Sequence, residues 1–142
     1  MKKVKAFVIT TLIFIWFFAF YAINVPKVKL PYKISTAEIY LSGGSSSKII
    51  TVNTNLVKFI FGKKGEAYVI SDDVSEEEIL ERLNATKIFV EQTEFGKSVY
   101  AYSEEIDYST TLYGREINVH LHFSNAEDAK IKIGFPLIFG SF

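Results

Sequence analysis

The sequence contains no cysteine among its 142 residues. This absence excludes disulfides, thiolate metal sites and a cysteine nucleophile. The chain also has no excess of either charge, because 16 Lys plus Arg balance 16 Asp plus Glu. It therefore lacks the global basic surplus that grips nucleic acid, and we expect no nucleic-acid partner. Its length corresponds to about one domain.

The chain is rich in apolar and aromatic residues. Hydrophobic residues make up 49% and aromatic residues 15% of it, which is too much for a disordered chain. The balanced charge hides an asymmetry, since Lys2, Lys3 and Lys5 all precede the first apolar run. The remainder carries 13 cationic and 16 anionic side chains. A mildly acidic body disfavours DNA or an anionic membrane surface as the main partner.

A membrane segment is predicted at residues 6–25, which contain no charged side chain. A helix of this length spans roughly 30 Å, about one bilayer core. The three lysines before it and the aromatic residues near its far end favour a cytoplasmic N-terminus. We therefore expect residues 1–25 to be a membrane anchor that contacts the lipid bilayer through residues 6–25. Everything after Pro26 would then be extracytoplasmic.

Two other interpretations of this segment stay open. A cleaved signal peptide would have a shorter apolar region and a cleavage site with small residues at alternate positions. Cleavage after Ala22 would place Phe20 three residues before the cut, which fits that pattern poorly. A buried core helix would need protein on every side of it. Length and flanking residues favour the uncleaved anchor.

The rest of the chain is predicted to be a linker, residues 26–33, and one α+β domain, residues 34–142. The linker contains two prolines and three lysines without periodicity. The domain is expected to hold a small antiparallel sheet with one helix packed on it. Its predicted strands before the helix are residues 34–42, 48–54, 56–61 and 66–71, the last two forming a hairpin around residues 62–65.

The helix is predicted at residues 75–84. Ser75 and Glu78 form a capping-box pattern, and acidic residues fill the first turn, where the helix dipole favours negative charge. Ile79, Leu80 and Leu83 make one apolar face, and Asn84 is a suitable terminator. Because ten residues are too few for an isolated helix, we expect this one to dock on the sheet.

Strands are also predicted after the helix. Residues 87–93 and 97–103 form a hairpin candidate, with a turn at residues 94–96. Residues 115–124 alternate between apolar and polar side chains, and residues 129–135 alternate again after a turn at 124–128. Alternation of this kind is typical of a half-buried antiparallel sheet.

His120 and His122 are the two histidines of the chain. Two residues apart on a strand, they point to the same face and could offer two imidazoles to one metal ion. A catalytic zinc usually has three protein ligands, and the sequence identifies no third one. The alternatives are an exposed polar face and a pH-sensitive patch.

Other candidate sites are weaker. The acidic residues 72–81 do not have the spacing of a calcium loop, and helix capping accounts for most of them. Glu104, Glu105 and Asp107 could supply the carboxylate pair of a hydrolase or form a solvated loop. Tyr100, Tyr102, Tyr108 and Tyr113 could line a binding surface, but packing between strands is favoured. No nucleophile elbow or phosphate-binding loop is present, so we expect neither catalytic residues nor a cofactor.

The C-terminal residues 133–142 are almost wholly apolar. Either they pack as a closing strand with a kink at Pro136, or they form a docking surface for a partner through Phe135, Leu137 and Phe139. Packing is favoured, because exposed apolar patches of this size are uncommon.

Three short segments, residues 99–103, 114–119 and 133–138, resemble the C-terminal part of the YwmB-like family. That family comprises uncharacterised proteins of spore-forming, low-GC Gram-positive bacteria. The resemblance covers roughly the last 65 residues. It implies an α+β fold like that of the TATA-box-binding protein, with a curved antiparallel sheet and a helix across it, and it carries no catalytic residues.

These observations predict a membrane-anchored extracytoplasmic domain of the cell envelope. We expect a non-enzymatic interaction or accessory role, with an envelope protein as partner and a link to sporulation. The alternative function is a ligand- or metal-binding envelope domain that uses His120 and His122. A hydrolase that uses Glu104, Glu105 or Asp107 is a third hypothesis.

Overall fold

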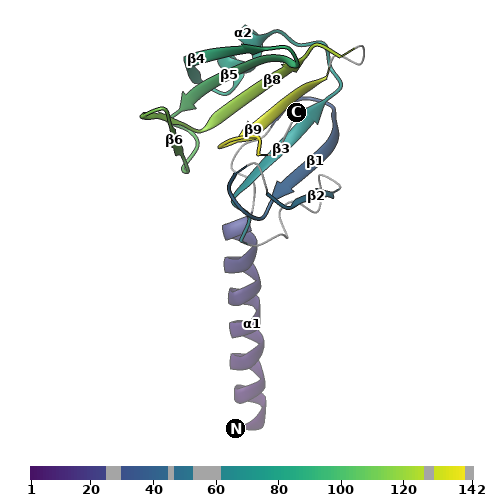
Figure 1. The fold of residues 1–142 in the computed structure, drawn as a ribbon. Helices are drawn as coiled ribbons and strands as arrows, with labels where there is room; N and C mark the ends of the chain where they lie inside the picture. Colours follow the sequence, from purple (N-terminus) through teal and green to yellow (C-terminus); the bar gives the residue numbers. More distant parts are fainter. Residues whose placement is uncertain (25–29, 45–46, 53–61, 127–129, 140–142) are drawn as a thin grey trace.

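The fold is an apolar helix followed by an antiparallel sheet domain, as seen in a computed structural model (Figure 1). The structure describes residues 1–24, 30–44, 47–52, 62–126 and 130–139. The predicted strand at residues 56–61 lies outside the described residues. So do residues 26–29 of the predicted linker, residues 127 and 128 of the predicted turn, and residues 140–142 of the apolar C-terminal segment.

Helix α1, Lys2–Asn24, extends away from the sheet domain as a separate rod (Figure 1). Its most apolar stretch, Lys3–Phe20, is long and apolar enough to cross a membrane, and none of that stretch is buried by the rest of the chain. A helix near the N-terminus with this length and composition also fits a signal sequence. The position agrees with the segment predicted at residues 6–25.

Seven strands form one sheet in the order β2-β1-β3-β9-β8-β5-β4, and every neighbouring pair is antiparallel. This confirms the predicted α+β class. The order places β3 and β9 near the middle, so β3 is buried along its whole length. The strands are β1 Ile34–Tyr40, β2 Ile49–Val52, β3 Gly65–Ile70, β4 Ala85–Thr93, β5 Gly96–Ser103, β8 Val119–Ser124 and β9 Ile131–Phe135.

Helix α2, Glu76–Arg82, connects β3 to β4. The Ser75 hydroxyl accepts a hydrogen bond from the Glu78 backbone N–H at 3.2 Å, which is half of the predicted capping box. The helix ends at Arg82 with Leu83 as its C-cap, and Asn84 follows with a φ of 46°, in the left-handed region that Asn tolerates. The predicted helix and its terminator are confirmed.

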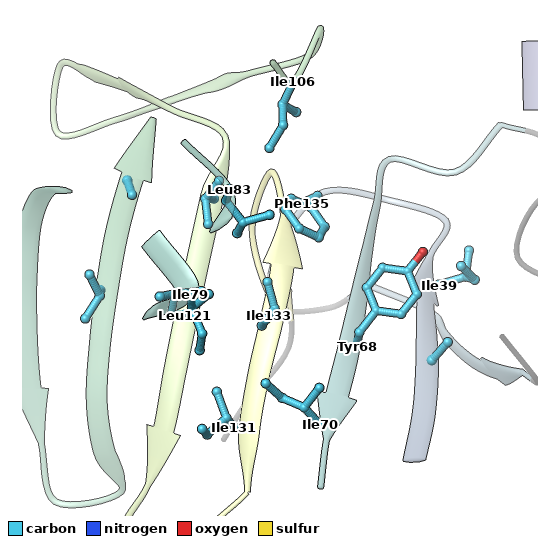
Figure 2. Close-up of a cluster of buried hydrophobic side chains, with 14 residues drawn as sticks. Ile39, Tyr68, Ile70, Ile79, Leu83, Ile106, Leu121, Ile131, Ile133 and Phe135 are labelled. Carbon is cyan, nitrogen blue, oxygen red and sulfur yellow. The ribbon is translucent and has the colours of Figure 1, made fainter. Parts of the chain in front are cut away.

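Helix α2 packs on one face of the sheet, which we call the core face. Ile79 and Leu83 of the helix meet Leu121, Ile133 and other aliphatic side chains from five strands (Figure 2). Leu121 and Ile133 have no exposed surface. Each such side chain stabilises the fold by about 2 kcal/mol through removal from water.

The first described residues after α1 belong to this core rather than to a free stalk. Leu30 and Tyr32 pack against the core-face cluster, and the Lys33 backbone N–H donates to an Asp72 oxygen at 2.8 Å. The Arg82 guanidinium lies over the Tyr32 ring. Of the predicted linker 26–33, the part that the structure describes is therefore fastened to the domain.

The strand predicted at residues 115–124 is interrupted at Asn118, which corrects that prediction. Asn118 is fully buried, and its side chain bonds the backbone N–H and C=O of Ser103 at 2.8 and 2.7 Å and the Ile106 C=O at 3.2 Å. These bonds hold Asn118 against the turn after β5. The strand pairing that ends at Ile117 therefore stops before Asn118, and the pairing of β8 with β5 begins after it. Before it, β7 Arg115–Ile117 pairs with β6 Thr110–Leu112 in a separate ribbon.

Candidate functional site

The side chains that could carry chemistry gather on the sheet face opposite α2, which we call the polar face. Alternation along β8 sends Val119 and Leu121 to the core face and His120 and His122 to the polar face, as predicted. The register aligns His120 with Tyr100 of β5, and His122 with Lys132 of β9.

His120 is almost completely buried, with 2% of its surface exposed. Its Nδ1 atom accepts the Ile138 backbone N–H at 3.1 Å, and its ring stacks on Tyr100 with a centroid separation of 4.4 Å. Burial, together with the nearby His122 and Lys132, lowers the pKa of His120 to about 3. His120 is therefore neutral at physiological pH and acts as a hydrogen-bond acceptor for the C-terminal segment.

His122 is also buried, so neither histidine lies on an exposed polar face. Its Nδ1 atom is 3.0 Å from the hydroxyl oxygen of Ser98 on β5. Burial first, and then the charge of Lys132, lowers the pKa of His122 below its usual value. Unlike His120, His122 lines a recess in the polar face.

A metal site at this histidine pair stays a prediction. The Nδ1 atoms of His120 and His122 are both engaged, with Ile138 and Ser98 respectively. Within the described residues no group of three or more His, Cys, Asp or Glu side chains could hold a metal ion. The sequence identified no third ligand either, whereas a catalytic zinc usually has three protein ligands.

Aromatic rings form a row across the outer strands of the polar face. Phe89 of β4 stacks on Tyr100 with a centroid separation of 4.4 Å, and Tyr100 stacks in turn on His120. Tyr113 and Arg115 of the β6–β7 ribbon cover the exposed side of Phe89. Burial, followed by a hydrogen bond to Glu91, raises the pKa of Tyr100. These contacts match the packing role predicted for Tyr100.

The C-terminal segment folds back over the polar face. Phe135 ends β9 and is fully buried in the core-face cluster. Ile138 then lies over Gly134, where a Cβ would come within 2.5 Å of the Ile138 side chain. Phe139 meets Tyr40 edge to face at 5.5 Å between ring centroids. The favoured prediction, a packed C-terminal segment, agrees with this arrangement as far as Phe139.

Partner binding through Phe135, Leu137 and Phe139 stays a prediction. Of these three side chains, Leu137 and Phe139 are partly exposed, while Phe135 has no exposed surface. A partner that approaches the folded domain could therefore contact Leu137 and Phe139 only.

A recess in the polar face has a volume of about 630 Å³. Strands β1, β3, β8 and β9 form its floor, and the turn residues 94, 95, 125, 126 and 130 form the described part of its wall. Cavities of about 300–1,000 Å³ are typical of small-molecule sites. Its lining includes Glu38, Phe95, His122, Ser124, Asn125 and Lys132.

An ion pair crosses the floor of the recess. The Lys132 ammonium lies 3.1 Å from both carboxylate oxygens of Glu38. The Tyr40 hydroxyl donates to the same carboxylate at 2.8 Å. Burial and this hydrogen bond raise the pKa of Tyr40, so it remains a donor at physiological pH. The Glu38 carboxylate is thus held in one orientation.

A smaller hollow of about 340 Å³ lies at the end of β3. Its buried group is Glu66, which is 3% exposed and pairs with Lys63 at 2.6 Å. Burial, followed by the charge of Glu66, raises the pKa of both Tyr68 and Tyr108. The charge of Glu66 is already balanced by Lys63. We therefore assign the residues around this hollow a structural role.

Of the two acidic groups considered in the sequence, the one at α2 has structural partners. Glu76 is 7% exposed and is paired with Lys87 at 2.8 Å and with Lys97, which ties α2 to β4 and β5. Burial alone would raise the pKa of Glu76, but the hydrogen bonds and charges of the two lysines outweigh it and lower the pKa. Glu104, Glu105 and Asp107 are exposed.

Sequence reasoning missed most of the recess. Glu38 and Lys132 are 94 residues apart, and nothing local indicates that they meet. It also missed the β6–β7 ribbon, although a signal was present. Tyr113 and Gly114 both have positive φ angles, 50° and 73°, and a Gly in a two-residue connection is typical of such a hairpin.

The comparisons with known proteins leave the geometry as the basis for a functional assignment. No family model, curated protein or solved structure matches the chain. The resemblance to the YwmB-like family therefore stays a prediction.

Proposed function

We propose that the chain is a single-pass membrane protein whose extracytoplasmic domain serves as an interaction or accessory module of the cell envelope. Residues 6–25 cross the bilayer, and the sheet domain carries no catalysis of its own. The observation that carries this proposal is the exposure of α1, whose apolar stretch Lys3–Phe20 is not buried by the rest of the chain. A surface of that size and character needs a membrane or a partner.

The orientation rests on charge. Lys2, Lys3 and Lys5 precede the apolar stretch, and positive residues favour the cytoplasmic side. Phe20, three residues before the cut that would follow Ala22, disfavours cleavage. The N-terminus is then cytoplasmic, the sheet domain extracytoplasmic and the helix an anchor.

The interaction role is supported by what the buried polar groups do. His120 holds the C-terminal segment, and Glu76 holds α2. These groups serve packing, whereas the recess presents polar side chains on a rigid sheet. The resemblance to the YwmB-like family adds the sporulation-related envelope of a spore-forming bacterium as the expected setting.

The proposal is tested by topology. The full chain with a C-terminal tag is produced in a bacterium. One portion of intact cells with a permeabilised outer layer is treated with protease from outside. Membranes from a second portion are washed at alkaline pH. We expect the full-length mass in the washed membrane and loss of the tag on protease treatment. Exchange of Lys2, Lys3 and Lys5 for Glu is the matched control, which should weaken the orientation.

Three results would contradict the proposal. A shortened chain released from the membrane identifies a signal peptide. A protease-protected tag reverses the orientation. Catalytic turnover that a single polar substitution abolishes refutes the non-enzymatic role.

A second candidate function is ligand binding at the envelope, for which the recess is the specific observation. Of the two histidines proposed for it, His122 lines the recess, and His120 bonds the C-terminal segment. The two functions are compatible, because a recess on an anchored domain can be the surface through which the module interacts.

A further inference from the structure

The wall of the recess is built from two turns that are fastened together. The Asn125 backbone N–H donates to the Phe95 C=O at 3.0 Å, and the Asn125 side chain donates to the Glu94 C=O at 3.4 Å. Gly96 permits this approach, because a Cβ there would lie 2.1 Å from the Phe123 carbonyl oxygen. Residues 94–96 and 123–125 of the wall are therefore held together.

This wall presents an aromatic ring to the cavity. Phe95 lines the recess and keeps 55% of its surface exposed. Its backbone is fixed at both ends, by Asn125 and by the Thr93 hydroxyl, which accepts the Phe95 N–H at 3.2 Å. An exposed ring on a hydrogen-bonded backbone, beside polar groups, offers an apolar surface on which a flat ligand can stack.

The floor offers a donor and an acceptor side by side. An ammonium group has three donors, and the Lys132 ammonium makes two contacts with Glu38. A carboxylate has about four acceptor positions, of which Lys132 and Tyr40 take three. Each partner of the pair thus has capacity for a further bond, and two adjacent hydroxyl groups would use both.

The charges around the recess balance. Among its described lining residues, Lys130 and Lys132 are cationic and Glu38 and Glu94 are anionic. His122 adds no charge at neutral pH, because burial lowers its pKa. A ligand with its own charge would have to compete with one partner of the Lys132–Glu38 pair. A neutral ligand would leave the pair intact.

We infer that the recess binds a neutral saccharide, with neighbouring hydroxyls on Lys132 and Glu38 and the apolar face of a sugar ring on Phe95. Ser124, Asn125 and Thr36 supply further hydroxyl and amide groups around the ring. The inference deepens the proposed function, because an extracytoplasmic domain meets the glycans of the envelope. It names the chemistry of the partner that the module holds.

The test uses the full chain in phosphatidylcholine nanodiscs, purified in a detergent without a sugar head group, because such a head group would occupy the recess. The probes are the neutral trimer of N-acetylglucosamine, its cationic deacetylated counterpart, and the anionic trimer of galacturonic acid. Saturation-transfer NMR measures binding of each one. We expect transfer to the neutral trimer and at least about tenfold weaker binding of both charged trimers.

Two substitutions then exchange the charge preference. Glu38→Gln leaves Lys132 uncompensated, so affinity for the neutral trimer should fall about tenfold and the anionic trimer should gain. Lys132→Met should weaken the neutral trimer by a similar factor and favour the cationic one. Phe95→Ala should also weaken the neutral trimer, without a change in charge preference.

Glu78→Gln is the matched control, because Glu78 pairs with Arg82 at 3.0 Å on the other side of the sheet. It should leave binding of all three trimers unchanged. Thermal unfolding of every variant separates loss of binding from loss of folding.

Each other outcome overturns the inference. Tighter binding of the anionic or the cationic trimer makes the recess a site for a charged ligand. Absence of transfer to any trimer, in folded protein, removes the saccharide site. Because these measurements use nanodiscs without a defined inside, they are independent of the topology experiment, and either proposal can fail alone.

Discussion

The two faces of the sheet use the same strands for different purposes. On the core face, aliphatic side chains such as Leu121 and Ile133 fill the space beneath α2 and have no exposed surface. On the polar face, the neighbouring residues His120, His122 and Lys132 meet specific partners at hydrogen-bond distance. Alternate residues of β8 and β9 therefore have different roles. Those on the core face stabilise the fold by burial, and those on the polar face make specific hydrogen bonds or ion pairs.

The difference shows in how each face is covered. Helix α2 covers the core face through packed apolar side chains. Such packing tolerates exchanges that conserve side-chain volume. The described part of the C-terminal segment covers part of the polar face through a hydrogen bond to His120, close approaches at Gly134 and Gly65, and a ring contact with Tyr40. Another part of the polar face is the recess. The two faces should therefore respond differently to substitution.

The largest effect is expected on the core face. Leu121→Ala removes a side chain with no exposed surface and should lower the free energy of unfolding by about 3 kcal/mol. Denaturant unfolding of the full chain in micelles measures it. Thr36→Ala, an exposed change on the polar face, is the control and should stay within about 0.5 kcal/mol of the original protein. Equal effects would contradict the division between the faces.

The next effect concerns the cover of the polar face. Gly134→Ala places a Cβ within 2.5 Å of Ile138 and should cost about 2 kcal/mol while displacing the C-terminal segment. At Gly43 the nearest atom to an added Cβ is 3.9 Å away, so Gly43→Ala is the matched control. Limited proteolysis of the last residues reports the displacement. A Gly134→Ala protein as resistant as the original would refute this account of the segment.

Neutralisation of charge compares the faces directly. Glu76→Gln removes a buried charge that holds two lysines and should cost about 2 kcal/mol. Glu38→Gln alters a pair that is more exposed and should cost no more than about 1 kcal/mol. Urea unfolding of both variants at neutral pH tests the order, and a larger loss for Glu38→Gln would reverse it.

Acid should weaken the polar face before it affects the carboxylates. Because the pKa of His120 is about 3 in the folded protein and about 6.5 when unfolded, the unfolded state takes up the proton first. The stability that neutral His120 provides is complete above about pH 6.5 and is lost as the pH falls toward 3. Between about pH 7 and 5 the loss should be about 2 kcal/mol. His120→Gln should flatten this slope in a pH series of unfolding curves, and an unchanged slope would refute the assignment.

Local patterns predicted most of the elements. The capping residues Ser75 and Glu78 located α2, and alternation along residues 115–124 correctly assigned the histidines to the face opposite the core. These features depend on residues that are close to one another in the sequence. That is why a sequence alone can indicate them.

The features that failed depend on distant contacts. Asn118 looked like another polar residue of an alternating strand, but its bonds to Ser103 and Ile106 interrupt the ladder. An exposed polar face was one interpretation of the two histidines, but both are buried, and the C-terminal segment that bonds His120 lies 18 residues along the chain. The recess itself depends on β1 and β9 lying on either side of β3, an arrangement set by strand order.

The most direct test of a functional polar face uses the two histidines as reporters. The chain contains only His120 and His122, so labelling histidine with ¹³C and ¹⁵N gives two signals in the full chain. His122 lines the recess, whereas His120 lies beneath the C-terminal segment. Titration with the neutral trimer of N-acetylglucosamine should shift the His122 signal and leave His120 in place. An unmoved His122 signal at saturating sugar, or equal shifts of both, would contradict the claim that the recess is the binding site.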